Sequence, residues 1–274
     1  MTTSHARAVR AERLDVRDLT VVHHGPDGPV RAVDGVSLSV APGTALCLLG
    51  ESGSGKSTLA RTLIGLPGRA AEVRGSVRLS CTELGGLGER ALAGIRGRRV
   101  GYVPQDPDAA LDPLRRVGAQ LTEVLLRHRV TDGRRAARAA VPGLLDAAGV
   151  ADPVRVARSH PHELSGGLRQ RAAVALALAC GPGLLIADEP TTALDALVRA
   201  RVLDLFAHLV EERGIALLLV THDMGVARRI GHRAAVMRAG RIVESGPVDV
   251  LLRAPEHPYA AALVAAALPG GGRG

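Results

Sequence analysis

Residues 50 to 58 read Gly50-Glu51-Ser52-Gly53-Ser54-Gly55-Lys56-Ser57-Thr58, which matches the phosphate-binding pattern G-x-x-x-x-G-K-[ST]. A short apolar run, Thr44–Leu49, precedes this loop, and the spacing of apolar residues predicts a helix over Ser57–Ile64. The glycines let the backbone curl so that its N–H groups face an anion, and the helix start adds its positive end. Because a simple glycine-rich turn needs neither flanking element, we interpret the loop as a nucleotide-phosphate site.

The only lysine of the chain lies in this loop. Lys56 stands alone among 35 basic residues, and the other 34 are arginines. Lysine and arginine are not interchangeable at tight phosphate sites, so a single lysine at this position favours a functional role. We expect Lys56 to reach the β- and γ-phosphates of ATP and the Ser57 hydroxyl to hold Mg²⁺.

The composition is that of a globular protein. Of the 274 residues, 46% are hydrophobic and 23% are charged, which is unlike a disordered chain. The net charge of +8 is spread in short clusters, which is typical of a solvated surface. Aromatic residues make up only 1%, and RNA reading and single-strand binding depend on stacked aromatic rings. We therefore expect no nucleic-acid partner.

Cysteine usage and hydropathy indicate a cytosolic chain. Cys47, Cys81 and Cys180 lie far apart without metal-type spacing, so we expect buried, reduced thiols. No segment reaches the roughly 18 apolar residues that span a bilayer. The polar N-terminus has no signal-peptide core. We expect the chain to be soluble by itself, so that any membrane role requires partner chains.

Strands alternate with helices along most of the chain. This alternation around short apolar strands indicates an α/β fold with a parallel sheet and helices on both faces. Helical spacing from residue 111 to 157, broken at Asp132-Gly133 and at Gly149, indicates a helical insertion. The predicted strands are Leu14–Val22, Ala32–Val40, Thr44–Leu49, Val73–Leu79, Arg99–Val103, Leu184–Ala187, Ile215–Val220 and the hairpin Arg233–Arg238 with Arg241–Ser245. The other predicted helices are Ser57–Ile64, most of Gly166–Cys180, Ala196–Arg213 and Asp223–Arg229.

Two carboxylates follow the apolar strand at residues 184 to 187. Asp188 and Glu189 come at its carboxyl end, where ligands bind in parallel α/β sheets. Asp188 is suited to bind Mg²⁺ through water, and Glu189 is suited to orient and deprotonate the attacking water. An apolar run before Asp-Glu is a weak signal alone, but beside a phosphate loop it becomes strong.

A second glycine-rich helix start follows at Ser165, Gly166 and Gly167. It can bind an anion, although a helix start with glycines also has a purely structural explanation. One nucleotide needs only one phosphate loop. We therefore expect this second site to contact a nucleotide bound mainly by another subunit, across a dimer.

These segments together resemble the ABC ATPases over nearly the whole chain, from about Leu14 to Leu268. The resemblance implies a P-loop NTPase with a RecA-like core, an antiparallel β subdomain and a helical signature subdomain over about residues 106–172. It implies an ATPase domain over residues 13–268, between a flexible tail (1–12) and a flexible end (269–274). It also implies two nucleotides sandwiched in a head-to-tail dimer.

Other positions fit the same family. Gln105 fits the glutamine that contacts Mg²⁺ and faces the membrane partner, and Asp195 fits the D-loop. His222 fits the switch histidine that senses the γ-phosphate. His23 stands where the family usually has an aromatic ring that stacks on adenine, and Leu168 stands where most signatures have Gln. We expect His23 to lower the affinity for nucleotide, because imidazole stacks with less area, and we expect activity to persist with Leu168, because the backbone and Ser165 contacts are kept.

A narrower resemblance is to the ATPases of oligopeptide, dipeptide and nickel importers. It is carried by Gln105-Asp106-Pro107, the signature segment 160–171, the segment 187–195 and Pro255-Glu256-His257-Pro258-Tyr259. An apolar residue in place of the signature Gln is common in one of the two paired ATPases there. The resemblance implies a sister ATPase subunit, although a homodimer remains open, together with two transmembrane permease subunits and, indirectly, an extracellular solute-binding protein.

The importer motor, peripheral on the cytoplasmic face of the cell membrane, has two alternatives. An exporter motor would use the same ATPase chemistry, and a solute-binding protein encoded nearby would favour import. A non-transport ABC ATPase acting on DNA or the ribosome is the other alternative. The DNA-repair type needs a long coiled-coil insertion and the ribosome type usually has two cassettes, and this sequence shows neither.

Overall fold

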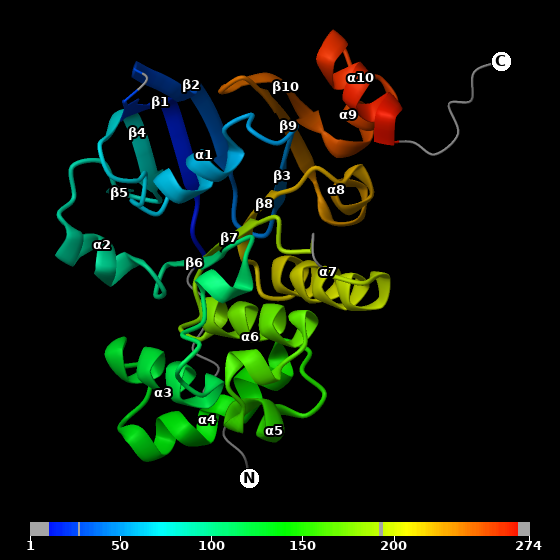
Figure 1. The fold of residues 1–274 in the computed structure, drawn as a ribbon. Helices are drawn as coiled ribbons and strands as arrows, with labels where there is room; N and C mark the ends of the chain where they lie inside the picture. Colours follow the sequence, from blue (N-terminus) through cyan, green and yellow to red (C-terminus); the bar gives the residue numbers. More distant parts are fainter. Residues whose placement is uncertain (1–10, 27, 192–193, 268–274) are drawn as a thin grey trace.

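A six-stranded sheet forms the centre of the fold, in the order β10-β9-β3-β8-β7-β6 (Figure 1). The structure is a computed structural model, and it describes residues 11–26, 28–191 and 194–267. Neighbouring strands from β9 to β6 are parallel, and only β10 runs antiparallel to its neighbour β9. The strands are β3 (Ala45–Leu49), β6 (Val100–Val103), β7 (Leu184–Asp188), β8 (Ala216–Val220), β9 (Arg233–Arg238) and β10 (Arg241–Pro247).

Both faces of this sheet are buried, as the apolar runs predict. Ala45, Cys47 and Leu49 of β3 pack into one hydrophobic cluster, while Leu46 and Leu48 pack into another. This alternation follows from the two-residue period of a strand. Helices α6 (Gly166–Leu178), α7 (Ala196–Glu211) and α8 (Met224–Ile230) share the first cluster, and α1 (Lys56–Thr62) shares the second. The expected sheet with helices on both faces is confirmed.

A second, antiparallel sheet lies over the face that α1 covers (Figure 1). Its order is β2-β1-β4-β5, with β1 (Leu14–Gly25), β2 (Gly28–Val40), β4 (Ala71–Leu79) and β5 (Thr82–Glu83). The first two strands extend further than predicted, because Gly25 pairs with Gly28 and leaves little of the expected turn over residues 24–29. The family's antiparallel β subdomain is therefore present.

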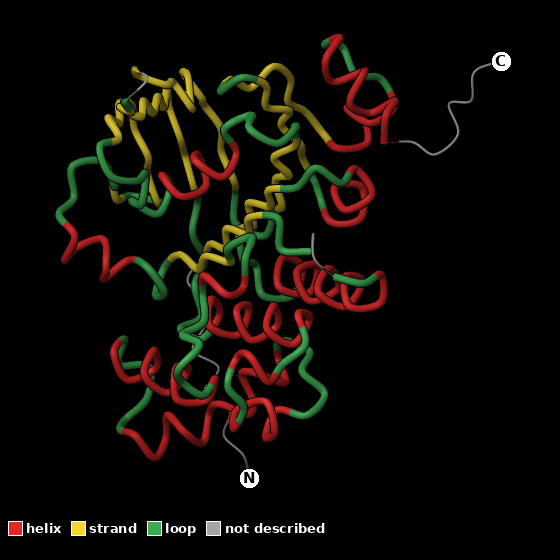
Figure 2. The backbone as a smooth tube through the Cα atoms, in the orientation of Figure 1, coloured by secondary structure: helices red, strands yellow, loops and turns green. Residues whose placement is uncertain are grey.

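The insertion expected over about residues 106–172 is helical and forms one end of the molecule (Figure 2). It contains η1 (Pro107–Ala109), α3 (Val117–Arg127), α4 (Arg134–Ala147), α5 (Pro153–Arg158), η2 (Pro161–Glu163) and the start of α6. The predicted breaks fall between α3 and α4 and between α4 and α5. Gly133 and Gly149 both have positive φ there, which glycine adopts without strain.

Three short helices were not predicted. These are α2 (Glu89–Ile95), α9 (Val248–Arg253) and α10 (Pro258–Ala267). The first two are seven and six residues long, too short to show a clear helical period, and α10 is almost uniformly apolar in sequence. In α10, Ala260 and Val264, four residues apart, are buried in the main core.

Only the last two residues of the expected N-terminal tail, 11 and 12, fall within the described part of the chain. Residues 1–10 and 268–274 lie outside the described residues, but Glu12 is only 1% exposed and forms an ion pair with Arg99 at 2.6 Å. The prediction of a tail through residue 12 is therefore wrong at its last position. The sequence showed only a charged residue there, because its partner lies 87 residues further along the chain.

The cysteines and the helices bear on two further predictions. Cys47 is buried, Cys180 is partly buried and Cys81 is exposed, so the expectation of buried thiols is wrong for Cys81. All three are free cysteines. Among the described helices, none combines the length and the hydropathy that crossing a bilayer requires.

Candidate functional site

The loop between β3 and α1 requires glycine at two close approaches. Gly50, Gly53 and Gly55 all have positive φ, which L-residues with a side chain rarely adopt. A Cβ atom at Gly50 would lie 2.3 Å from the carbonyl oxygen of Met237, and one at Gly55 would lie 2.1 Å from that of Ala32. The loop is thus held between β9 and β2, with its backbone fixed in the curled form predicted from the sequence.

The Lys56 side chain lies inside this loop and hydrogen bonds to its residues. Its ammonium group donates hydrogen bonds to the carbonyl oxygens of Gly50 (2.8 Å) and Glu51 (2.7 Å) and to Ser54 Oγ (3.3 Å). Burial lowers the pKa of Lys56, and the carboxylates of Glu189, Asp188 and Glu51 oppose that shift. The chain's single lysine therefore interacts electrostatically with the two carboxylates at the end of β7.

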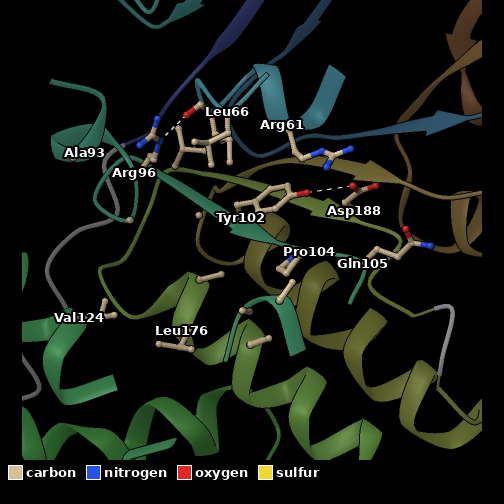
Figure 3. A pocket seen from close by; sticks show the side chains of 18 of the residues that line it. Arg61, Leu66, Ala93, Arg96, Tyr102, Pro104, Gln105, Val124, Leu176 and Asp188 are labelled. Carbon is tan, nitrogen blue, oxygen red and sulfur yellow. Dashed lines mark hydrogen bonds between the residues drawn. The ribbon is translucent and has the colours of Figure 1, made fainter. Parts of the chain in front are cut away.

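Asp188 accepts hydrogen bonds from two side chains, and Figure 3 shows the bond from Tyr102. Ser57 Oγ donates to Asp188 Oδ1 at 3.0 Å, and the Tyr102 hydroxyl donates to Oδ2 at 3.2 Å. Burial raises the pKa of Asp188, while these two hydrogen bonds hold it down. Burial also raises the pKa of Tyr102, and the adjacent Asp188 carboxylate adds to that rise. The phenol therefore stays protonated and acts as a donor.

Glu189 meets two other predicted site residues. Its Oε2 lies 3.3 Å from Gln105 Nε2 and 3.3 Å from His222 Nδ1. The backbone of Glu189 has a φ of 44°, a left-handed conformation that is uncommon for a residue with a side chain. Its amide donates to the Val220 carbonyl oxygen of β8 at 2.9 Å, which fixes this turn. Strain of this kind occurs at functional sites more often than elsewhere.

The fold therefore brings six of the predicted site side chains to one edge of the sheet. The group consists of Lys56, Ser57, Gln105, Asp188, Glu189 and His222. The first two lie at the start of α1, the third follows β6, Asp188 is the last residue of β7, and Glu189 and His222 follow β7 and β8. Because the parallel strands end at the same edge, residues far apart in sequence converge there.

This donor set fits magnesium and a polyphosphate. Mg²⁺ prefers oxygen ligands, and the Ser57 hydroxyl and the Asp188 carboxylate already meet at 3.0 Å. Gln105 adds a neutral amide at the same edge. The curled glycine backbone and the first turn of α1, with Ser57 and Thr58, present backbone N–H groups that lack intrahelical partners. The exposed residues Ser52 and Gly53 form the tip of the loop.

The predicted signature residues lie on a different element. Ser165 caps α6, with its side chain accepting from Leu168 N, and Gly166 and Gly167 form the first turn. A Cβ atom at Gly167 would lie 3.0 Å from the Val198 side chain of α7, so close helix packing also favours glycine there. Their contact with a second subunit's nucleotide stays a prediction.

Asp195 has a structural role of its own, and His23 lies on a strand of the antiparallel sheet. Asp195 caps α7, accepting from the amides of Leu197 (3.1 Å) and Val198 (2.9 Å). His23 lies on β1, and a Cβ atom at Gly68, in the turn after α1, would meet its ring at 3.5 Å. The D-loop role of Asp195 and the adenine contact of His23 stay predictions.

Two tyrosines reach this site that the sequence did not indicate as site residues. Tyr102 donates to Asp188, as described above, and the Tyr259 hydroxyl accepts a hydrogen bond from the Glu51 amide at 3.2 Å. These are the two tyrosines of the whole chain. Tyr102 falls at an alternate position of a four-residue strand, and its neighbourhood depends on β6 pairing with β7. Tyr259 lies in the segment 255–259, which showed a resemblance but no chemistry.

Comparison with known proteins gives a consistent result. The family described as ABC transporter matches residues 33–192. The chain is 47% identical over 251 residues to the oligopeptide transport ATP-binding protein OppD of Mycobacterium tuberculosis, covering 92% of this chain and 41% of that protein. It is 45% identical to a putative peptide import ATP-binding protein of Brucella melitensis, covering 92% of this chain and 76% of that protein.

Solved structures agree on the fold. A dimeric ATP-binding cassette in a post-hydrolysis state, bound to ADP and Pi, superimposes with a TM-score of 0.78 at 28% identity, covering 86% of this chain and 98% of that one. The expected P-loop NTPase fold with its two additional subdomains is thus confirmed. The chain spans less than half the length of the mycobacterial relative. On the family match, the relatives and the fold together, this chain belongs to the ABC transporter family.

Proposed function

We propose that this chain is the ATP-binding and ATP-hydrolysing subunit of an ABC importer, driving uptake of peptides or a related small solute, nickel or a metal chelate included. The observation that carries the proposal is the convergence of Lys56, Ser57, Asp188 and Glu189 at one sheet edge. The relatives support import, because their names are those of peptide transport and peptide import ATP-binding proteins at 40–47% identity. Those names favour an importer over an exporter or a non-transport ATPase.

Phosphate binding rests on the loop and on Lys56. The ammonium group is held by the Gly50 and Glu51 carbonyl oxygens, within the curl that would surround the phosphates. A phosphate oxygen carries more negative charge than a carbonyl, so the ammonium would bind it in preference. Ser57 and Asp188 would hold Mg²⁺ directly or through water, and the bound ion would supply positive charge against the phosphates.

Hydrolysis rests on Glu189. Its carboxylate oxygen Oε2 accepts a hydrogen bond from Gln105 and lies 3.3 Å from Nδ1 of His222. A carboxylate in contact with two side chains is oriented, and an oriented carboxylate can position a water and take its proton. We assign Glu189 as the general base. His222 and Gln105 orient it, and His222, which is 55% exposed, lies where a terminal phosphate can reach it.

Completion of the site requires a second subunit. Ser165, Gly166 and Gly167 form the start of α6, a helix distinct from the one that follows the phosphate loop. In a head-to-tail dimer this helix start would contact the partner's nucleotide, with Asp195 beside it. The solved cassette that resembles this chain is dimeric. Leu168, in place of the usual Gln, favours a sister ATPase as the partner, with a homodimer as the second possibility.

Coupling to transport would use a pocket beside the site. The pocket has a volume of about 760 Å³ and extends from Asp188 and Gln105 past Tyr102 to Val124 of α3 and Leu176 of α6 (Figure 3). Its lining joins the sheet edge to the helical subdomain. We propose that a cytoplasmic helix of one transmembrane permease subunit docks there, while the second permease subunit docks on the partner ATPase. This docking would put the chain on the cytoplasmic face of the membrane. An extracellular solute-binding protein would deliver the solute.

The proposal is tested by measuring solute uptake in cells from which the gene for this chain has been deleted. Complementation with the wild-type chain should restore uptake of a labelled oligopeptide or of nickel, and Lys56→Ala should not. The matched control is Arg138→Ala on α4, remote from the phosphate loop. Full complementation of both peptide and nickel uptake by Lys56→Ala would exclude an ATP-driven importer role. Wild-type complementation of drug export alone would favour the exporter alternative.

A further inference from the structure

We propose that the C-terminal segment 255–259 is part of the nucleotide site, with Tyr259 as a positioning residue for the phosphate loop. The proposal rests on the assignment of residues 50–58 as that loop. The Tyr259 hydroxyl accepts a hydrogen bond from the Glu51 amide at 3.2 Å, across 208 residues of sequence. The segment, which the sequence marked only by a family resemblance, therefore contacts the phosphate loop directly.

This hydrogen bond holds the same peptide group that Lys56 contacts. The peptide between Gly50 and Glu51 accepts from Lys56 Nζ at its oxygen (2.8 Å) and donates to Tyr259 at its N–H (3.2 Å). With both ends fixed, the peptide plane cannot rotate freely. Gly50 itself has a φ of 151° and no side chain to limit the rotation of its backbone. Tyr259 therefore sets the orientation of the carbonyl on which the lysine rests.

The segment is itself anchored to the sheet. The amides of Glu256 and His257 donate to the two carboxylate oxygens of Glu244 on β10, at 3.1 and 2.9 Å. His257 Nδ1 then accepts from the Tyr259 amide at 3.1 Å, which fixes the first turn of α10. A carboxylate that accepts two backbone amides is a strong anchor, because charge-assisted hydrogen bonds are stronger than neutral ones.

The Tyr259 ring is held from its other side as well. The guanidinium of Arg238, at the end of β9, lies 4.8 Å from the ring centroid, within cation–π distance. The preceding residue, Met237, has its carbonyl oxygen against Gly50. Strand β9 therefore packs against the loop at Gly50 and also positions the tyrosine that binds the next amide. The hydroxyl is placed by a rigid frame and not by a mobile side chain.

A loop held in its binding form loses less conformational entropy when a ligand binds. Loss of one neutral hydrogen bond corresponds to about a 2- to 10-fold change in an equilibrium constant. We expect Tyr259→Phe, which keeps the ring and removes only the hydroxyl, to weaken ATP binding by about that factor. The rate at saturating ATP should change little, because Glu189 and its partners are not altered.

The experiment measures three quantities on the purified full chain. They are the Kd for ATP by fluorescent-nucleotide displacement, KM and kcat for phosphate release, and amide hydrogen exchange without nucleotide. We expect Kd and KM to rise together in Tyr259→Phe and the Glu51 amide to exchange faster. Exchange in β7 and β8 should not change, and a general loss of stability would accelerate it there too. Glu211→Gln, at an exposed position at the end of α7 outside this segment, is the control and should leave all three quantities unchanged.

A second variant tests the anchor independently. Glu244→Ala releases the two amides that hold the segment, and it should weaken ATP binding to a similar extent. Combined with Tyr259→Phe it should add little, because both act on one structural unit. An unchanged or tighter Kd in Tyr259→Phe, with normal Glu51 exchange, would overturn the proposal. If the wild-type chain did not bind ATP, the phosphate-loop assignment would be wrong instead.

Discussion

Replacing Glu189 by Gln separates hydrolysis from binding. Gln keeps the size of the side chain and an oxygen that can accept from Gln105 Nε2, which lies 3.3 Å from the carboxylate. It cannot take a proton from water at neutral pH. Loss of a general base slows the chemical step by about 10²–10⁴-fold, which corresponds to about 2.7–5.5 kcal/mol in activation free energy. We expect phosphate release to fall by that factor.

Binding of nucleotide should not fall in the same variant. The Glu189 charge helps to raise the pKa of Asp188, so its removal lets Asp188 ionise more readily. The same charge helps to raise the pKa of Lys56, but burial is the larger cause of that group's lowered pKa. Loss of a carboxylate near a polyanion also removes repulsion. ATP and Mg²⁺ should therefore bind at least as tightly as in the wild type.

The assay compares phosphate release, ATP binding and sedimentation for the wild type, Glu189→Gln and the control Glu211→Gln. Glu211 lies exposed at the end of α7, so its loss changes the net charge equally without touching the site. If ATP holds the head-to-tail dimer together and hydrolysis separates it, Glu189→Gln should accumulate as an ATP-bound dimer. Phosphate release within about threefold of the wild type would place the base elsewhere, since a base contributes about 10²-fold or more. Loss of ATP binding would instead make Glu189 a binding residue.

Three other predictions concern stability and reactivity. Asp188→Asn should raise the melting temperature at pH 7 while abolishing Mg²⁺-dependent turnover. Because the pKa of Asp188 is raised in the folded chain, its ionised carboxylate lowers stability at pH values above the unfolded pKa. In a series of thermal melts, the gain in melting temperature should therefore shrink as the pH falls toward 4. Glu12→Ala leaves the Arg99 guanidinium with only neutral acceptors and should lower the free energy of unfolding by about 3 kcal/mol in urea titration, whereas an effect below about 0.5 kcal/mol would mean that the pair contributes nothing. Cys81 should react with iodoacetamide well before Cys180, since burial raises the pKa of the Cys180 thiol to about 11, and mass spectrometry of the labelled peptides would detect a reversed order.

The main elements of the fold could be predicted because their signals are local. Short apolar runs predicted β3, β7 and β8, whose apolar side chains alternate between two cores. The Asp132-Gly133 and Gly149 breaks correctly divided the helical insertion. Short elements such as α2 could not be predicted, because seven residues give less than two full turns of periodicity.

The site residues could be predicted in type but not in contact. The pattern around Lys56 and the Asp188-Glu189 pair identified the chemistry. The hydrogen bonds from Tyr102 to Asp188 and from Glu51 to Tyr259 could not be foreseen, because they depend on strand register and on where α10 packs. The burial of Glu12 was missed for the same reason, since a charge reads as exposed until its partner is known.

Three features at this sheet edge lower the stability of the fold, and a shared function explains why they occur together. Glu189 has a strained left-handed backbone, Asp188 is a carboxylate whose charged form is disfavoured by burial, and Lys56 is an ammonium disfavoured in the same way. Each would be relieved by an ordinary substitution, such as Gly at position 189 or Asn at position 188. A chain optimised only for folding would not retain all three within one hydrogen-bonded group. Their retention is understandable if opposite charges and a fixed carboxylate must face the same bound phosphate, because function then requires what stability disfavours.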